Sequence, residues 1–259
     1  MNYTLVVSLS AIGLLLGMVI LMEVGRRIGI GRLRRDPENL SKGTGMLEGA
    51  VFGLLGLLIA FTFSGAASRF ENRLHLVVEE ANAIGTAYLR IDLLPNDTQP
   101  EMRELFRRYL DIRAEAYRDL ENVTAFKAKL DETASLQGKI WAKAVSECRK
   151  PGILMQTEML LIPALNAMFD ITTTRSAATR NHPPMIVFFL LIGSSLIGSL
   201  LAGYGMAGGK ERSWLHMAAF VLIISLTTFV ILDLEFPRLG LIRIDAADQI
   251  LIDLRKSMQ

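Results

Sequence analysis

Four stretches of the chain contain no Asp, Glu, Lys or Arg, and each is long enough to cross a membrane. They cover residues 1–22, 49–68, 181–209 and 213–232. A membrane-spanning helix needs about 20 mostly apolar residues to cross roughly 30 Å of hydrocarbon. The sequence therefore predicts an all-α, polytopic membrane protein with four transmembrane helices.

The first stretch differs from a secretory signal peptide. No basic residue precedes its apolar core, which runs past the usual length of about 7–15 residues. Its basic residues follow it, in the segment GRRIGIGRLRR. We therefore expect residues 1–22 to be retained as a span.

The spans divide the chain into four parts. We expect a first transmembrane pair with a basic loop at 1–68, a helical extramembrane stalk or domain at 69–180, a second pair at 181–236 and a C-terminal tail at 237–259. Between spans two and three, apolar residues recur at helical spacing and predict helices over 99–122, 131–148 and 151–178. The region inserted between the two pairs is therefore predicted to be helical.

The second span shows no stop signal after Ser68. Its apolar period of three to four residues continues from Phe70 to Ile91, and the next proline is Pro95. One helix over 45–94 would be ~75 Å long, more than twice the thickness of the hydrocarbon core. An isolated stalk of this length is unstable, so it must pack against other helices or against copies of itself.

Small residues line one face of the second span at steps of three and four. They are Gly49, Gly53, Gly56, Ala60, Ser64 and Ser68. Such ridges let membrane helices approach closely. Two interpretations are open. Either the ridge packs inside its own subunit, or several copies of the helix surround an axis, where the flanking residues Phe52, Ile59 and Phe63 would narrow a hydrophobic constriction.

Charged residues follow the second span and would lie near the mouth of such a pore. Rings of Arg69 and Arg73 would favour anions, whereas rings of Glu79 and Glu80 would favour cations. The sequence therefore leaves the charge selectivity open.

The distribution of basic residues predicts an orientation. The segment 24–44 is strongly basic, and a short basic loop of this kind stays in the cytoplasm. This assignment puts the N-terminus outside and the helical region in the periplasm. Arginines near other span ends, such as Arg175 and Arg180, are the opposing signal.

Several classes of function are disfavoured. The chain has three well-separated histidines and no HExxH, GxSxG or Walker motif, so we expect no enzyme activity and no catalytic residue. A single cysteine, Cys148, excludes an intrachain disulfide and a cysteine-based zinc site. We expect no metal and no cofactor. The net charge of +2, without a basic run interleaved with aromatics, argues against nucleic-acid binding.

Three segments resemble a known family: GLLGLLIAFTFSGAASRFENR, EEANAIGTAYLRIDLLP and DLEFPRLGLIRID. With the two-plus-two arrangement of spans, they are similar over nearly the whole chain to the bacterial family of bestrophin-like membrane proteins. Bestrophins are pentameric anion channels with four spans per subunit and a pore lined by the second span. The resemblance implies a homo-oligomer, by analogy a pentamer, in the bacterial inner membrane, with Ile59 and Phe63 nearest the hydrophobic neck.

The resemblance also has departures. The acidic calcium clasp of animal bestrophins is absent from this sequence, so calcium gating is not implied. In addition, the analogy puts the helical region in the cytosol, which is the opposite of the orientation that the basic segment favours.

Our leading hypothesis is a homo-oligomeric ion channel whose second span lines the pore. Its partners would be the lipid bilayer, copies of itself and inorganic ions. The alternative is a non-conducting scaffold, signalling or proton-driven stator-type assembly, because stator subunits share the arrangement of two spans, a large helical insert and two further spans. A solute transporter is disfavoured because the two pairs of spans do not form an inverted repeat.

Overall fold

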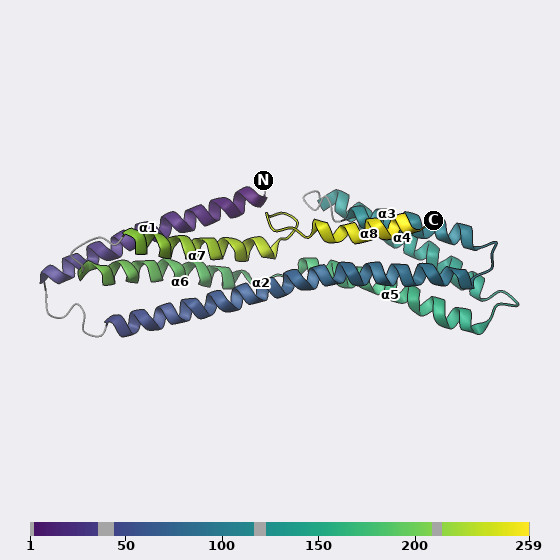
Figure 1. The fold of residues 1–259 in the computed structure, drawn as a ribbon, viewed down its shortest axis with the longest axis horizontal. Coiled ribbons are helices and arrows are strands. Elements are labelled where there is room, and N and C mark those ends of the chain that lie inside the picture. The colour runs from purple at the N-terminus through teal and green to yellow at the C-terminus, as the bar shows by residue number, and fades with distance from the viewer. Residues whose placement is uncertain (1–2, 36–43, 117–122, 209–213, 259) are drawn as a thin grey trace. The chain divides into compact units, whose positions relative to one another are not determined.

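The computed structural model describes residues 3–35, 44–116, 123–208 and 214–258, and these residues form helices without any strand (Figure 1). The predicted all-α class is therefore confirmed. The α-helices in these ranges are α1 (Tyr3–Arg35), α2 (Thr44–Leu89), α3 (Gln99–Ala116), α4 (Val123–Cys148), α5 (Met155–Arg180), α6 (Met185–Gly205), α7 (Trp214–Glu235) and α8 (Asp245–Ser257). Two short 3-10 helices, η1 (Arg90–Leu93) and η2 (Met206–Gly208), follow α2 and α6.

The four predicted spans are also confirmed. Among the described residues, four helical stretches are long and apolar enough to cross a membrane, and they contain α1, α2, α6 and α7. The charge-free part of α2 ends at Ser68, and the helix continues without a break to Leu89. η1 then ends before Pro95, because a residue that precedes proline is disfavoured in helical conformation.

The first helix is longer than predicted. α1 continues past Met22 to Arg35, so residues that we expected in a basic loop are helical. No proline interrupts the chain before Pro37. In addition, Gly25 and Gly29 pack closely against α6 and η2, which compensates for the low helix propensity of glycine.

The boundaries of the inserted helices also differ from the predictions. α4 begins at Val123, earlier than the predicted residue 131, and the part of the first predicted helix at 117–122 lies outside the described residues. α5 begins at Met155 and not at residue 151. The cause is a turn at Pro151 and Gly152, in which Gly152 has a φ of 91°, a conformation that favours glycine.

The chain divides into two compact units, which we describe separately. The first unit comprises Met1–Ser68 and His182–Phe236, and the second comprises Arg69–Asn181 and Pro237–Gln259. The first unit therefore holds α1, α6, α7 and the beginning of α2. The second unit holds the rest of α2 together with α3, α4, α5 and α8.

In the first unit, α1 and α6 are in backbone contact through two glycines. A Cβ atom added to Gly25 would lie 1.9 Å from the carbonyl oxygen of Leu200, and one added to Gly203 would lie 1.9 Å from that of Met22. No larger residue fits at such distances. The two glycines therefore set the closest approach of α1 and α6, as small residues do in membrane helix pairs.

α7 completes the interior of the first unit. A cluster of buried apolar residues joins α1 to α7 and consists of Leu14, Met18, Met22, Met217 and Val221. Hydroxyl groups in this region donate to nearby acceptors, for example Ser225 to the Met18 sulfur at 3.7 Å and Ser199 to the carbonyl of Ser195 at 3.0 Å. Local acceptors of this kind keep polar groups satisfied in an apolar interior.

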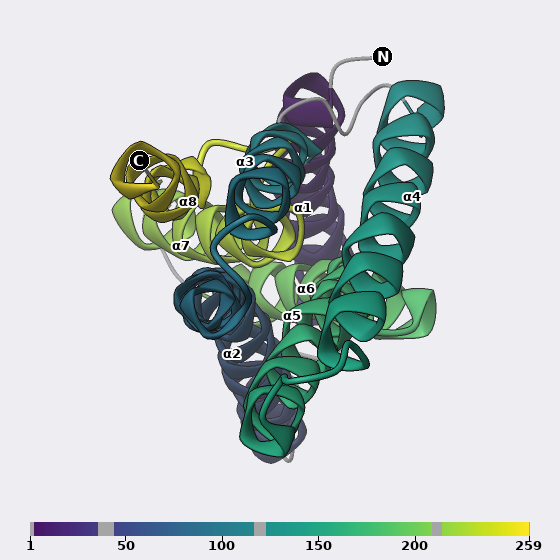
Figure 2. The same cartoon turned by 90° about the vertical axis from the view of Figure 1, so that its right-hand side faces the viewer.

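The second unit has a conventional apolar core. α2 contributes Val77 and Ile84 and η1 contributes Ile91, and all three are fully buried with residues such as Phe106. α8 packs along α3, as Figures 1 and 2 show, and the Arg255 Nε donates to the Asp111 carboxylate at 2.8 Å. The apolar stripe of α2 therefore continues beyond the membrane segment as the packing face of a helical bundle.

A chain of buried ion pairs crosses this core. The Glu80 carboxylate accepts hydrogen bonds from Arg113 and from Arg175, each at 2.5 Å. Arg175 also donates to Asp248 at 2.8 Å, and Asp248 accepts two bonds from Arg238 at 2.5 and 2.9 Å. These five residues connect α2, α3, α5, the segment after α7, and α8.

All five residues of this ion-pair chain are buried, and Glu80 and Arg113 are fully so. Burial by itself would raise the pKa of Glu80, but the charges and hydrogen bonds of Arg113 and Arg175 hold it below its ordinary value. Glu80 is therefore a carboxylate whose charge is compensated inside the second unit. Removing one member of such a pair leaves an uncompensated buried charge.

The backbone contact between α1 and α6 predicts that a single added methyl group at this contact lowers stability. Gly203→Ala should lower the free energy of unfolding by roughly 1–3 kcal/mol, because the added Cβ forces the two backbones apart. Thermal unfolding of the purified protein in detergent would measure the change. Gly193→Ala on the same helix is the control, since no described atom outside the adjoining turns of α6 lies within 4 Å of its added Cβ. Equal melting temperatures for the two variants would contradict the contact.

The buried ion pairs predict that substitutions of the neighbouring residues Glu80 and Glu79 differ in their effect on stability. Glu80→Gln should lower the free energy of unfolding by about 3 kcal/mol or more, because it removes the buried carboxylate that both Arg113 and Arg175 bind. Glu79→Gln alters an exposed carboxylate and should change it by less than about 0.5 kcal/mol. Denaturant titrations of both variants in detergent provide the comparison.

A comparison of the wild type with Glu80→Gln tests the protonation state of the Glu80 carboxylate. Because the pKa of Glu80 is lowered in the folded protein, its stabilisation is complete above the ordinary Glu value of about 4.3 and is lost as pH falls from there through the lowered pKa. The wild type should therefore lose more stability than Glu80→Gln in this pH range. Identical pH profiles would show that the carboxylate is not ionised.

Candidate pore-lining face of α2

In the first unit, one face of α2 packs against the subunit's own helices. Leu55 and Ala66 are buried on this face, with 2% and 0% of their surface exposed. Phe52 lies against Phe220 of α7, with ring centroids 5.9 Å apart, and it also approaches Gly198 of α6. These contacts fix which side of α2 points into the subunit.

The opposite face of α2 carries the small-residue ridge, and it is exposed. Gly49, Gly53, Gly56, Ala60 and Ser64 are all exposed residues. No atom of the described chain lies within 4 Å of a Cβ added to any of the three glycines. Of the two interpretations that the sequence left open, packing of the ridge inside its own subunit is therefore not what this fold uses.

The three candidate constriction residues lie in different environments. Phe63 is 43% exposed and lies next to Ser64 on the side of the ridge. Ile59 is half-buried at its border. Phe52 is half-buried and directed toward Phe220, so its ring is held within the subunit. Phe63 is consequently the one of these three whose side chain is most open to the outside of the chain.

The charged residues predicted at the pore mouth are also divided between exposed and buried positions. Arg69 is half-buried, and Glu79 is exposed beside His75, with Nδ1 and Oε1 3.4 Å apart. Arg73 is buried and donates to the carbonyl oxygens of Ala178 and Asn181 at 3.1 and 3.0 Å. A guanidinium at these positions satisfies carbonyl groups at the C-terminal end of α5.

Two of these four residues thus have a structural role in the second unit. Arg73 caps α5, and Glu80 belongs to the buried ion-pair chain, so neither side chain is available to form a ring in an open pathway. We retain Arg69 and Glu79 as candidate mouth residues. Among the described residues there is no cluster of three or more His, Cys, Asp or Glu side chains that could hold a metal ion.

The ion-pair chain around Glu80 was not predicted from the sequence. A signal was available for Arg113, which follows the buried residues Tyr109 and Leu110 at helical spacing and so lies on the apolar stripe of α3. A charged residue on an apolar stripe indicates a buried pair. Its partner could not be deduced, because Glu80 lies on another helix.

The comparisons with known proteins agree with this fold. The family model for the Bestrophin-like domain matches residues 12–248. Two single-substitution variants of a bacterial Bestrophin homolog from Klebsiella pneumoniae each have a TM-score of 0.63 and 14% identity, with 93% of this chain and 98% of that chain covered. The comparison with curated proteins finds no match.

A third solved structure, a substituted variant of a membrane protein, has a TM-score of 0.59 and 16% identity, with 94% of this chain and 99% of that chain covered. At these identities the solved structures show a shared fold. The family match extends over most of the sequence and includes all four apolar stretches at least in part. The protein is a multi-pass membrane protein, and it belongs to the bestrophin-like family.

Proposed function

We propose that the protein is a homo-oligomeric ion channel in which α2 lines the pore. The observation that carries the proposal is the exposed small-residue ridge of α2, which has no neighbour from another described helix at any of its three glycines. Membership of the bestrophin-like family supports a channel-type function. A ridge of small residues permits close approach of another helix, and no helix among the described residues occupies this position, which supports contact with other copies of the chain.

In the proposed assembly, several copies of α2 surround a common axis. Gly49, Gly53 and Gly56 would let the helices come close together at one end of the span. Phe63 follows on the same side and would narrow the pathway, with Ile59 at its border. A ring of apolar side chains can close a pore to ions by excluding water, and it opens when the ring widens.

The proposal also has a topological part. We assign the protein to the bacterial inner membrane, with the basic end of α1 in the cytoplasm and the helical region 69–180 in the periplasm. The support is the cluster of basic residues between Arg26 and Arg35, which follows the first apolar segment directly. Because the region at 69–180 carries its own apolar core, it is suited to an aqueous compartment on either side.

The proposed constriction predicts a difference between two aromatic residues of α2. Phe63→Ala should raise the conductance or open probability several-fold in planar bilayers, because a smaller side chain lowers the barrier of an apolar ring to water and ions. Phe61→Ala is the matched control, since Phe61 is 68% exposed but points about 160° around the helix from Phe63, so the two rings cannot both face the proposed axis. Its currents should stay close to those of the wild type.

Two results would count against the channel. Currents that change equally in both variants would show that Phe63 does not line the pathway. Silent bilayers across voltage, pH and salt would favour a non-conducting scaffold, signalling or stator-type assembly. A stator-type assembly should also co-purify with a second membrane protein.

The proposed assembly also predicts where copies of the chain touch. Cys148 is the single cysteine, so Cys148→Ala gives a cysteine-free background for cross-linking. In that background Ser64→Cys should form covalent dimers on oxidation in the membrane, because the ridge allows the short Cα separation that a disulfide requires. Thr62→Cys is the control, since Thr62 is half-buried and its hydroxyl donates to the Leu58 carbonyl at 2.7 Å. Dimers from Thr62→Cys but not from Ser64→Cys would exclude the ridge as the contact.

A further inference from the structure

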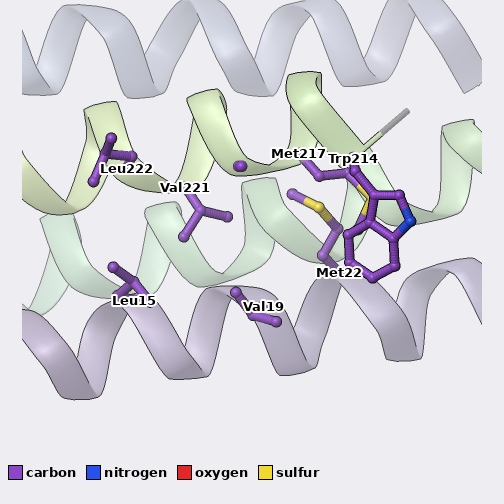
Figure 3. A pocket seen from close by; sticks show the side chains of 8 residues that line it. Leu15, Val19, Met22, Trp214, Met217, Val221 and Leu222 are labelled. Carbon is purple, nitrogen blue, oxygen red and sulfur yellow. The ribbon is translucent and has the colours of Figure 1, made fainter. Parts of the chain in front are cut away.

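A groove lies between α1 and α7 within the first unit (Figure 3). Its volume is about 300 Å³, and apolar side chains form its walls. Leu15, Val19 and Met22 of α1 line one side, and Trp214, Ala218 and Leu222 of α7 line the other. Figure 3 shows the side chains of Leu15 and Val19 pointing from α1 toward α7, with the Trp214 ring beside Met22.

The groove has the length and setting of one lipid leaflet. The seven-residue step from Leu15 to Met22 covers about 10 Å, and the step from Trp214 to Leu222 about 12 Å. Half of the hydrocarbon core is about 15 Å thick. Several lining residues are also open to the outside of the chain, including Val19 at 43% and Leu222 at 58% exposure. The groove is therefore continuous with the surroundings of two membrane-spanning helices.

One end of the groove changes from apolar to basic. On α1, Arg26 follows Met22 by four residues and so continues the face that carries Leu15 and Val19. On α7, Trp214 is the first residue of the helix, and tryptophan is typical of the level of the lipid headgroups. The nearby Glu23 is bound to Arg27, whose Nε lies 3.0 Å from its carboxylate. Arg26 thus gives this end of the groove a positive charge.

The walls of the groove do not suit a second helix. Close packing between membrane helices depends on small residues that let backbones approach, whereas the walls here are mostly Leu, Val, Met and Trp. A flexible acyl chain can follow such a surface and fill a narrow cavity. An anionic headgroup would then lie at the basic end.

We propose that this groove binds an anionic phospholipid, with one acyl chain between α1 and α7 and its phosphate beside Arg26. The proposal does not depend on ion conduction. It assigns a chemical class of ligand to the groove between α1 and α7, which is separate from the proposed pore-lining face of α2.

Tryptophan fluorescence provides the test, because the chain has only two tryptophans. Trp141→Phe leaves Trp214 as the sole indole, and the full-length protein is then reconstituted in vesicles. Phospholipids brominated on the acyl chain quench an indole that they touch. Brominated phosphatidylglycerol should quench Trp214 with about a fivefold higher relative binding constant than brominated phosphatidylcholine, since one basic residue contributes on this scale near a membrane surface.

Two pairs of variants separate the acyl-chain site from the headgroup site. Ala218→Phe fills the groove and should abolish the preference, whereas Ala219→Phe adds the same ring to the neighbouring exposed residue outside it. Arg26→Gln should reduce the preference for phosphatidylglycerol to about one while quenching by phosphatidylcholine continues. Arg27→Gln, which removes the cation paired with Glu23, should retain the preference.

Three outcomes would overturn the proposal. An unquenched Trp214 would show that protein covers the groove. Equal quenching by the two brominated lipids would show ordinary contact with bulk lipid. A preference that survives both Arg26→Gln and Ala218→Phe would place the anionic lipid elsewhere.

Discussion

The structure depends on the rotational position of α2, which buried contacts fix in each unit. In the second unit, Glu80 points inward because Arg113 and Arg175 bind its carboxylate. In the first unit, Leu55 and Ala66 are buried on the same helix. In each unit the buried residues of α2 are spaced close to a multiple of the helical repeat, 55 and 66 in the first and 73 and 80 in the second, so one side of the helix packs there. These buried contacts fix the orientation of α2 about its own axis within each unit.

This constraint decides what the other side of α2 can do. Because Leu55 and Ala66 are buried in the first unit, the small-residue ridge has to face away from the other helices of that unit. A surface of Gly, Ala and Ser gains little from contact with acyl chains, yet it permits close approach of another helix. Buried charge pairs of the kind around Glu80 contribute little net stability compared with apolar packing, but a misplaced partner is strongly destabilising. The ion pairs are therefore better understood as setting the orientation of α2 than as stabilising the unit.

The parts of the fold that follow from local sequence could be predicted, and the parts that follow from contacts between distant residues could not. Charge-free windows gave the four spans, and Pro95 marked the end of the long second helix. The pairing of Glu80 with Arg113 joins two helices, and no local pattern identifies such a partner. The glycines illustrate the same limit. Gly25 and Gly203 lie against another backbone, whereas no other described helix lies against Gly49 and Gly53, although all four belong to apolar helical segments with similar composition.

The candidate site was predictable to a similar extent. Spacing alone placed the ridge on one face, but it could not separate Phe63, which is exposed beside the ridge, from Phe52, which packs on Phe220. Within a bilayer, exchanging lipid contacts for protein contacts brings no hydrophobic gain, so the shape of a surface decides what covers it. The first unit presents two such surfaces. The small-residue ridge of α2 allows another helix to approach closely. The groove between α1 and α7 instead has large apolar side chains on its walls and a basic end, which suit a lipid acyl chain and an anionic headgroup.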